Sequence, residues 1–143
     1  MAQYQMTEKQ IISTAQQYDA AIQKKTASAR RIERVAVEVN ETIASLKEIE
    51  TINGPVLVKL GAGVFVEVNA KNIKTCKRGI SENAFVEDKI PEAIKWLEKK
   101  QKILEKNLIE EKKDVMKLEQ SLTEMVSVIK QIEAEKQKNF SGK

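Results

Sequence analysis

Apolar residues recur at alternating spacings of three and four along two long stretches of the chain. The first stretch contains one polar member, Lys25, and comprises Ile11, Ala15, Tyr18, Ile22, Lys25, Ala29, Ile32, Ala36, Val39, Ile43 and Leu46. The second contains the polar members Gln101 and Glu111 and comprises Ile90, Ile94, Leu97, Gln101, Leu104, Leu108, Glu111, Val115, Leu118, Leu122, Met125, Ile129 and Ile132. A repeat of about 3.5 residues over this length is typical of a coiled-coil seam. We therefore expect a long antiparallel pair of helices.

Residues typical of helix ends mark where the two helices should begin and end. Thr7 followed by Gln10 resembles a capping box. Gly54 can adopt a left-handed C-cap conformation, and Pro55 cannot continue a helix. Pro91 suits an early position of the second helix. The sequence predicts a mainly α fold with a small β insert in one domain, 1–143, with helices at 7–52 and 90–138, two β-hairpins at 55–89, and a tail that frays over 139–143.

The insert between the helices has the periodicity of strands. Val56 to Leu60 is a short apolar run, Gly61-Ala62-Gly63 turns the chain, and a second arm follows. A more polar hairpin is expected over 73–88, with its turn near 81–83. Two short hairpins leave edges and faces uncovered. We expect them to complete a sheet with other subunits through Val56, Val58, Leu60, Val64, Val66, Val68, Phe85 and Val86. Alternatively, the insert packs on its own helix ends near Ile49, Ile52, Ile90 and Ile94.

Apolar residues outside the seam gather where the two chain ends should meet. A surplus around a helix end exceeds what a two-helix seam can bury, and methionine suits surfaces that accept many partners. The functional interpretation is a client-binding patch made of Met1, Tyr4, Met6, Ile11, Ile12, Met125, Val126, Val128, Ile129, Ile132 and Phe140. The alternative is that these residues close the coiled coil or are scattered apolar positions.

Composition narrows the classes of function. The chain has 25 basic and 21 acidic residues, no histidine and one cysteine, Cys76. A disulfide within the chain and a nitrogen–sulfur metal site within one chain are therefore excluded. Glutamate alternates with lysine in the second helix, which disfavours nucleic-acid binding. No apolar run is long enough to span a membrane, and no signal peptide is visible, so we expect a cytoplasmic protein without cofactors.

Three other features have structural interpretations. Gly61-Ala62-Gly63 lacks the spacing of a phosphate-binding loop and enters a strand, so it is interpreted as a turn. Cys76 is interpreted as a small strand residue, since no histidine is present to activate it. The polar seam residues Lys25, Gln101 and Glu111 either set the helix register or pack their aliphatic stems while their polar ends reach water.

Two motifs lie at the joints of the expected order helix, two hairpins, helix: Val56-Leu57-Val58-Lys59-Leu60-Gly61-Ala62-Gly63 and Ala84-Phe85-Val86-Glu87-Asp88-Lys89-Ile90-Pro91-Glu92-Ala93-Ile94. With this order and these motifs, the chain resembles the α-class prefoldin subunits of archaea. The stretch 75–83 departs from the family, because it is more charged than the usual second hairpin. The resemblance implies a hexameric holdase that works without ATP. Its hairpins would form a β-barrel with β-class subunits, and its tips would deliver unfolded proteins to a group II chaperonin.

The sequence therefore predicts a prefoldin-like chaperone subunit, not an enzyme, since no acid–base constellation is visible. The alternative is a structural coiled-coil adaptor that oligomerises through the insert and binds one defined partner. Self-assembly into a homo-oligomer also remains open.

Overall fold

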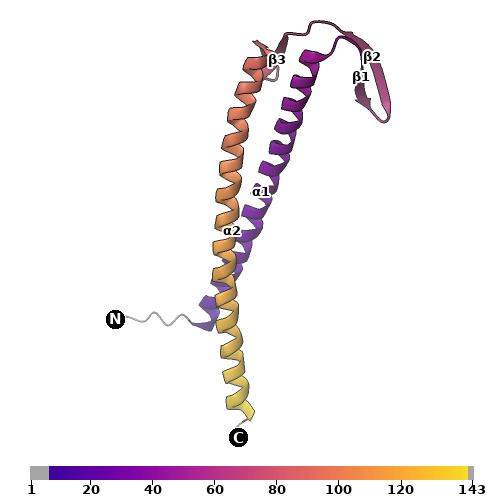
Figure 1. The fold of residues 1–143 in the computed structure, drawn as a ribbon. Helices are drawn as coiled ribbons and strands as arrows, with labels where there is room; N and C mark the ends of the chain where they lie inside the picture. Colours follow the sequence, from indigo (N-terminus) through magenta and orange to yellow (C-terminus); the bar gives the residue numbers. More distant parts are fainter. Residues whose placement is uncertain (1–6, 142–143) are drawn as a thin grey trace. The chain divides into compact units, whose positions relative to one another are not determined.

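The computed structural model describes the backbone of residues 7–141 and the side chains of residues 7–139. It contains two long helices and four short strands (Figure 1). In chain order the elements are α1 (Glu8–Thr51), β1 (Gly54–Gly61), β2 (Val64–Ala70), β3 (Thr75–Ser81), β4 (Ala84–Lys89) and α2 (Ile90–Ser141). The predicted fold class, a mainly α chain with two β-hairpins between its helices, is confirmed.

The chain divides into two compact units. The helical unit pairs α1 up to Glu33 with α2 from Lys106 onward, and the hairpin unit comprises 34–105. The hairpin unit therefore holds all four strands together with the helix turns next to them.

The capping box at the start of α1 is confirmed. The backbone N–H of Gln10 donates to Oγ1 of Thr7 at 3.3 Å, and the N–H of Thr7 donates to Oε1 of Gln10 at 3.0 Å. These two bonds satisfy donors that the first turn of a helix leaves unpaired.

Two predicted helix boundaries need correction. Gly54 is not a C-cap: α1 ends at Thr51, and Gly54 is the first residue of β1, with a φ of 144° that glycine tolerates. The tail also does not leave the helix after Lys138, because α2 continues to Ser141.

The predicted seam is confirmed at every position. All residues of both heptad series are buried or half-buried. In the hairpin unit, the buried seam residues form one core: Val39, Ile43, Ile90, Ile94 and Leu97. Burying a side chain of this size contributes about 1.5–3 kcal/mol. The core therefore fixes the start of α2 against the last turns of α1.

Contacts between the helices show that they run antiparallel within each unit. In the helical unit, Lys25 pairs with Asp114, and Glu8 pairs with Lys136. In the hairpin unit, the side-chain amide of Gln101 donates to Oδ1 of Asn40. These polar contacts are mostly exposed, so each adds at most about 1 kcal/mol. The apolar seam supplies most of the stability.

The four strands form two separate antiparallel sheets of two strands each. In the first hairpin, Val56 lies opposite Val68, and Val58 lies opposite Val66. Its turn residues Ala62 and Gly63 have φ values of 50° and 77°. Positive φ at both central residues is typical of the type I′ turn that suits two-residue hairpins. Gly61-Ala62-Gly63 is thus a turn, as predicted.

The second hairpin follows the predicted course over a shorter range. Strands β3 and β4 pair so that Arg78 lies opposite Val86, and Gly79 lies opposite Phe85. The turn at Glu82-Asn83 agrees with the expected position near 81–83.

Candidate assembly and client-binding surfaces

The β1–β2 hairpin presents apolar side chains on both faces. Alternation along the strands puts Val56, Val58, Val64, Val66 and Val68 on one face, the valine face. Val66 is 42% exposed, and Val64 is 54% exposed. Leu57 and Phe65 lie on the opposite face and are 69% and 51% exposed. A small hairpin with apolar groups exposed on both sides has the character of an interaction surface.

The β3–β4 hairpin has one covered face and one exposed face. Cys76, Arg78, Val86 and Asp88 alternate along the strands and are half-buried. On the exposed face the ring of Phe85 lies over Gly79, where an added Cβ would meet it at 3.7 Å. An aromatic ring over a strand glycine supplies packing that glycine lacks. Phe85 and Val86, which the sequence places in one assembly surface, therefore point to opposite sides of this hairpin.

Arg78 ties the covered face of β3–β4 to α2. Its Nε donates to Oδ2 of Asp88 at 2.9 Å, and its guanidinium lies 4.5 Å from the ring centroid of Trp96. The ammonium of Lys100 also approaches that ring, at 5.3 Å from the centroid. Cations over an indole ring are attracted by its negative face. Trp96 is therefore approached by two cations, one from β3 and one from α2 itself.

Two further contacts hold the same hairpin. The N–H of Ile90 donates to the carbonyl of Lys74 at 3.0 Å. Ile73 and Cys76 pack against the core of the hairpin unit. Burial, and secondarily the charge of Asp88, raises the pKa of the Cys76 thiol, while Arg78 opposes the shift. The interpretation of Cys76 as a structural strand residue agrees with its packing.

The structure shows one of the two packing modes that the sequence left open, and the pairing of the insert with other subunits stays a prediction. Part of it packs on the helix ends, because Ile73 and Cys76 join a core that includes Ile90 and Ile94. The valine face of β1–β2 is half exposed. Sequence reasoning missed three contributors: Leu57, Arg78 and Trp96. The contact between Arg78 and Trp96 joins a strand to a helix across a turn, and no periodicity in the sequence could signal it.

The expected client-binding residues divide into three groups. Ile11, Met125, Ile129 and Ile132 are half-buried seam residues, whereas Ile12, Val126 and Val128 are about two-fifths exposed, at 40%, 39% and 41%. Met1, Tyr4, Met6 and the side chain of Phe140 lie outside the described residues. Because the Glu8–Lys136 pair joins the start of α1 to the end of α2, the exposed members belong to one end of the helical unit.

The polar seam residues make contacts across the seam. The ammonium of Lys25 lies 3.0 Å from Oδ2 of Asp114 and 3.9 Å from Oε2 of Glu111. The bond to Asp114 raises the pKa of Lys25, and the charges of Asp114 and Glu111 add to the rise against the cost of desolvation. The side chain of Lys25 is also 36% exposed, so it both reaches water and pairs with the other helix.

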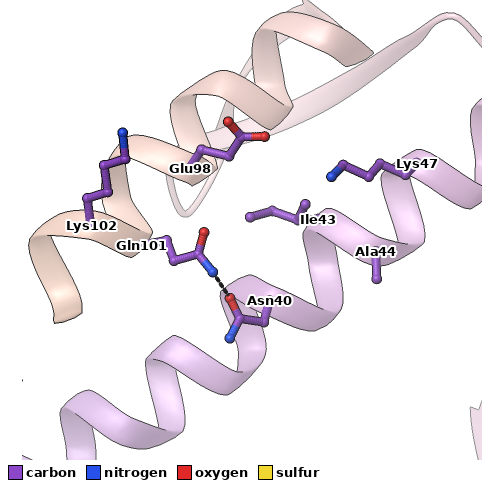
Figure 2. Close-up of a pocket in the computed structure, with 7 residues that line it drawn as sticks. All are labelled: Asn40, Ile43, Ala44, Lys47, Glu98, Gln101 and Lys102. Atoms are coloured by element: carbon purple, nitrogen blue, oxygen red, sulfur yellow. Dashed lines mark hydrogen bonds between the residues drawn. The ribbon is translucent and has the colours of Figure 1, made fainter.

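A polar groove lies between the helices of the hairpin unit. Figure 2 shows the side chains of Lys47 and Glu98 on opposite walls, with the bond between Gln101 and Asn40 on its floor. Its lining is Asn40, Ile43, Ala44, Lys47, Glu98, Gln101 and Lys102. The groove therefore has the character of a solvated gap in the seam.

Within the part of the chain that the structure describes, no group of three or more histidine, cysteine, aspartate or glutamate side chains could hold a metal ion. Neither described helix has an apolar stretch of the length that crossing a membrane requires.

Comparisons with known proteins agree with this architecture. A solved chain of filamentous PFD, a prefoldin, from Methanocaldococcus jannaschii is similar to this chain at 25% sequence identity and a TM-score of 0.58. The similarity covers 86% of this chain and 98% of that one. No curated protein matches. The family model for prefoldin subunits matches residues 18–137, which span both helices and both hairpins. The chain therefore belongs to the prefoldin family.

Proposed function

We propose that this chain is an α-class subunit of a prefoldin hexamer that holds unfolded proteins without ATP. The observation that carries the proposal is the apolar surface of β1–β2, which is exposed on both faces although the hairpin is short. Such a surface needs partner strands, and the family supplies them as other prefoldin subunits. The presence of two hairpins, as in the α-class pattern, supports the class assignment.

Assembly proceeds in this proposal through the valine face, extended by Leu60 and by the exposed ring of Phe85. Changing Val66 to Asp would bury a carboxylate against partner strands, at a cost of several kcal/mol. Sedimentation should then show smaller species with the helix content unchanged. Lys71→Asp is the control, since Lys71 is exposed and lies outside the strands. An unchanged mass for Val66→Asp would contradict this assembly surface.

The partner subunits are β-class chains in the hexamer, and self-assembly is the alternative. The relative from Methanocaldococcus jannaschii is described as filamentous, which favours testing the purified chain alone. Light scattering gives the mass directly. A mass of one or two chains that rises when a β-class subunit is added supports the hetero-hexamer, and a large homo-oligomer supports self-assembly.

Client capture takes place at the end of the helical unit that holds Ile12, Val126 and Val128. Fraying of this end costs little, because terminal helix turns have few contacts. Fraying would expose the seam residues Ile11, Met125, Ile129 and Ile132 as well. Several tips in one assembly would bind one unfolded chain at several segments, so weak contacts add up. Clients then pass to a group II chaperonin in the cytoplasm.

The second candidate function is a structural adaptor, favoured by the polar groove and ion pairs that would fix one helix geometry. An aggregation assay without ATP separates the two functions. The holdase should suppress aggregation of several unrelated unfolded proteins at comparable molar ratios. An adaptor should protect none of them or a single one, and that result would contradict the proposed holdase activity.

A further inference from the structure

The two hairpins have similar lengths and the same antiparallel pairing, yet they differ in how they are attached to the helices. The β3–β4 hairpin is connected by a ring contact, by packing and by a backbone hydrogen bond. These connections involve Arg78 with Trp96, Cys76 in the core, and Lys74 with Ile90. The pair Arg78–Asp88 also joins β3 to β4, so the helix contact stabilises both strands together.

Among the described residues, those of β1 and β2 make no side-chain hydrogen bond, ion pair or ring contact with a helix. Seven of their apolar side chains are between 41% and 69% exposed: Leu57, Val58, Leu60, Val64, Phe65, Val66 and Val68. An isolated two-stranded hairpin is only marginally stable in water. The ring contact between Arg78 and Trp96 therefore has no counterpart in β1–β2, and Ala70 at the end of β2 is the one residue of these two strands that is buried.

We infer that the two hairpins fold at different times. In the free subunit, β3–β4 is already formed and is locked onto α2. The β1–β2 hairpin opens readily in the free subunit and becomes stably ordered only when strands of a partner subunit pack on it. This inference rests on the proposed function to the extent that other subunits supply those strands. The contact of Arg78 with Trp96, which Lys100 also approaches, forms the lock.

The two hairpins would therefore have different roles during assembly. The locked hairpin presents preformed strand edges and the exposed ring of Phe85 to an incoming subunit. The β1–β2 hairpin loses conformational entropy when it orders, as segments that fold on binding do. Because that loss accompanies association, order in β1–β2 should depend on protein concentration and order in β3–β4 should not.

Amide hydrogen exchange followed by mass spectrometry tests the inference, with peptides that cover 54–70 and 75–89. In the Val66→Asp variant, free of partner strands, β1–β2 amides should exchange at nearly the rate of an unstructured chain. The β3–β4 amides should exchange about 100-fold more slowly. In the wild type, raising the concentration should slow exchange throughout β1–β2, whereas in β3–β4 it should slow exchange only for the edge amides that gain a partner strand. Equal exchange in the two hairpins of the monomer overturns the inference.

Substitution of Arg78 tests the lock itself. Arg78→Ala should speed exchange in β3–β4 about tenfold or more, since it removes the ring contact and the pair with Asp88. It should also change the fluorescence of Trp96, the only tryptophan in the chain. Lys77→Ala, on the exposed face of the same strand, is the control and should do neither. If Arg78→Ala exchanges like the wild type, Trp96 is not a lock.

A second variant and a second readout keep the test of the lock decisive. Asp88→Asn is a milder variant that should shift β3–β4 exchange in the same direction if Arg78→Ala fails to fold. If Val66→Asp still assembles, the proposed assembly surface is wrong, but the effect of Arg78→Ala inside β3–β4 still decides whether the lock exists. Alkylation of Cys76, which packs against the core, should accelerate in every variant that releases the hairpin.

Discussion

Oε2 of Glu111 lies 3.9 Å from the ammonium nitrogen of Lys25, so a polar interruption of the α1 seam faces a polar interruption of the α2 seam. That oxygen is buried and accepts no hydrogen bond from the described residues. Asp114, at 3.0 Å from the same nitrogen, takes the stronger contact. A charged layer inside an apolar seam disfavours other registers, because a shift would leave the charges against apolar residues.

Reversing the charge of Lys25 tests this layer. Lys25→Glu places a third carboxylate beside Glu111 and Asp114, so thermal denaturation should begin at a lower temperature. Adding Asp114→Lys should restore part of the loss, because it recreates a pair of opposite charges. A double-mutant cycle measured by circular dichroism gives the coupling. Additive effects of the two substitutions would show that Lys25 and Asp114 do not interact in solution.

Seam substitutions should have a graded effect on stability. Leu97 is buried in the core of the hairpin unit, whereas Leu108 is half-buried. Leu97→Ala should therefore cost about 3 kcal/mol and Leu108→Ala about 2 kcal/mol. Lys99→Ala, at an exposed position, should cost less than about 0.5 kcal/mol. Urea denaturation measures all three, and equal costs for Leu97→Ala and Lys99→Ala would contradict the heptad register.

Stability should decline at alkaline pH through two groups. The pKa of Cys76 is raised above 9.0 and that of Lys25 above 10.5. In both cases the folded chain keeps a proton that the unfolded chain releases. The contribution to the free energy of unfolding is therefore fully present below the ordinary pKa, and it is lost as the pH rises through the raised pKa. Cys76→Ser should flatten the part of this decline that starts near pH 9.0. Urea denaturation at a series of pH values checks it, and an identical profile for both proteins would contradict it.

Most of the fold could be predicted because it depends on local and periodic signals. Thr7 and Gln10 cap α1 through residues three apart, and the alternation of Val64, Val66 and Val68 predicts a strand with one apolar face. The capping box, the seam and the first hairpin followed from such patterns. The family assignment followed from the hairpin and helix-start motifs.

What could not be predicted depends on contacts between distant positions. Phe85 and Val86 lie on opposite faces of β3–β4, and the docking of Arg78 onto Trp96, together with the packing of Cys76 against the core, decides which face is covered. The position of Gly54 in β1 depends on its pairing with Ala70 across the first hairpin. The client-binding residues stay a prediction, because exposure of Ile12, Val126 and Val128 is compatible with capture without demonstrating it.

The most direct test of the proposed chaperone function compares aggregation of an unfolded protein in the presence of two triple variants. The tip variant carries Ile12→Gln, Val126→Gln and Val128→Gln. The control variant carries the same chemical changes at exposed apolar positions of the hairpin unit, Val35→Gln, Val37→Gln and Ile103→Gln. Both should keep the wild-type helix content and mass.

We expect that suppressing aggregation takes at least about tenfold more of the tip variant than of the wild type, because the variant loses apolar contacts at every tip of the assembly. The control variant should protect like the wild type, and protection should survive raised salt, which screens charges but not apolar contacts. A tip variant that protects at the wild-type ratio would contradict client capture at the coiled-coil tips.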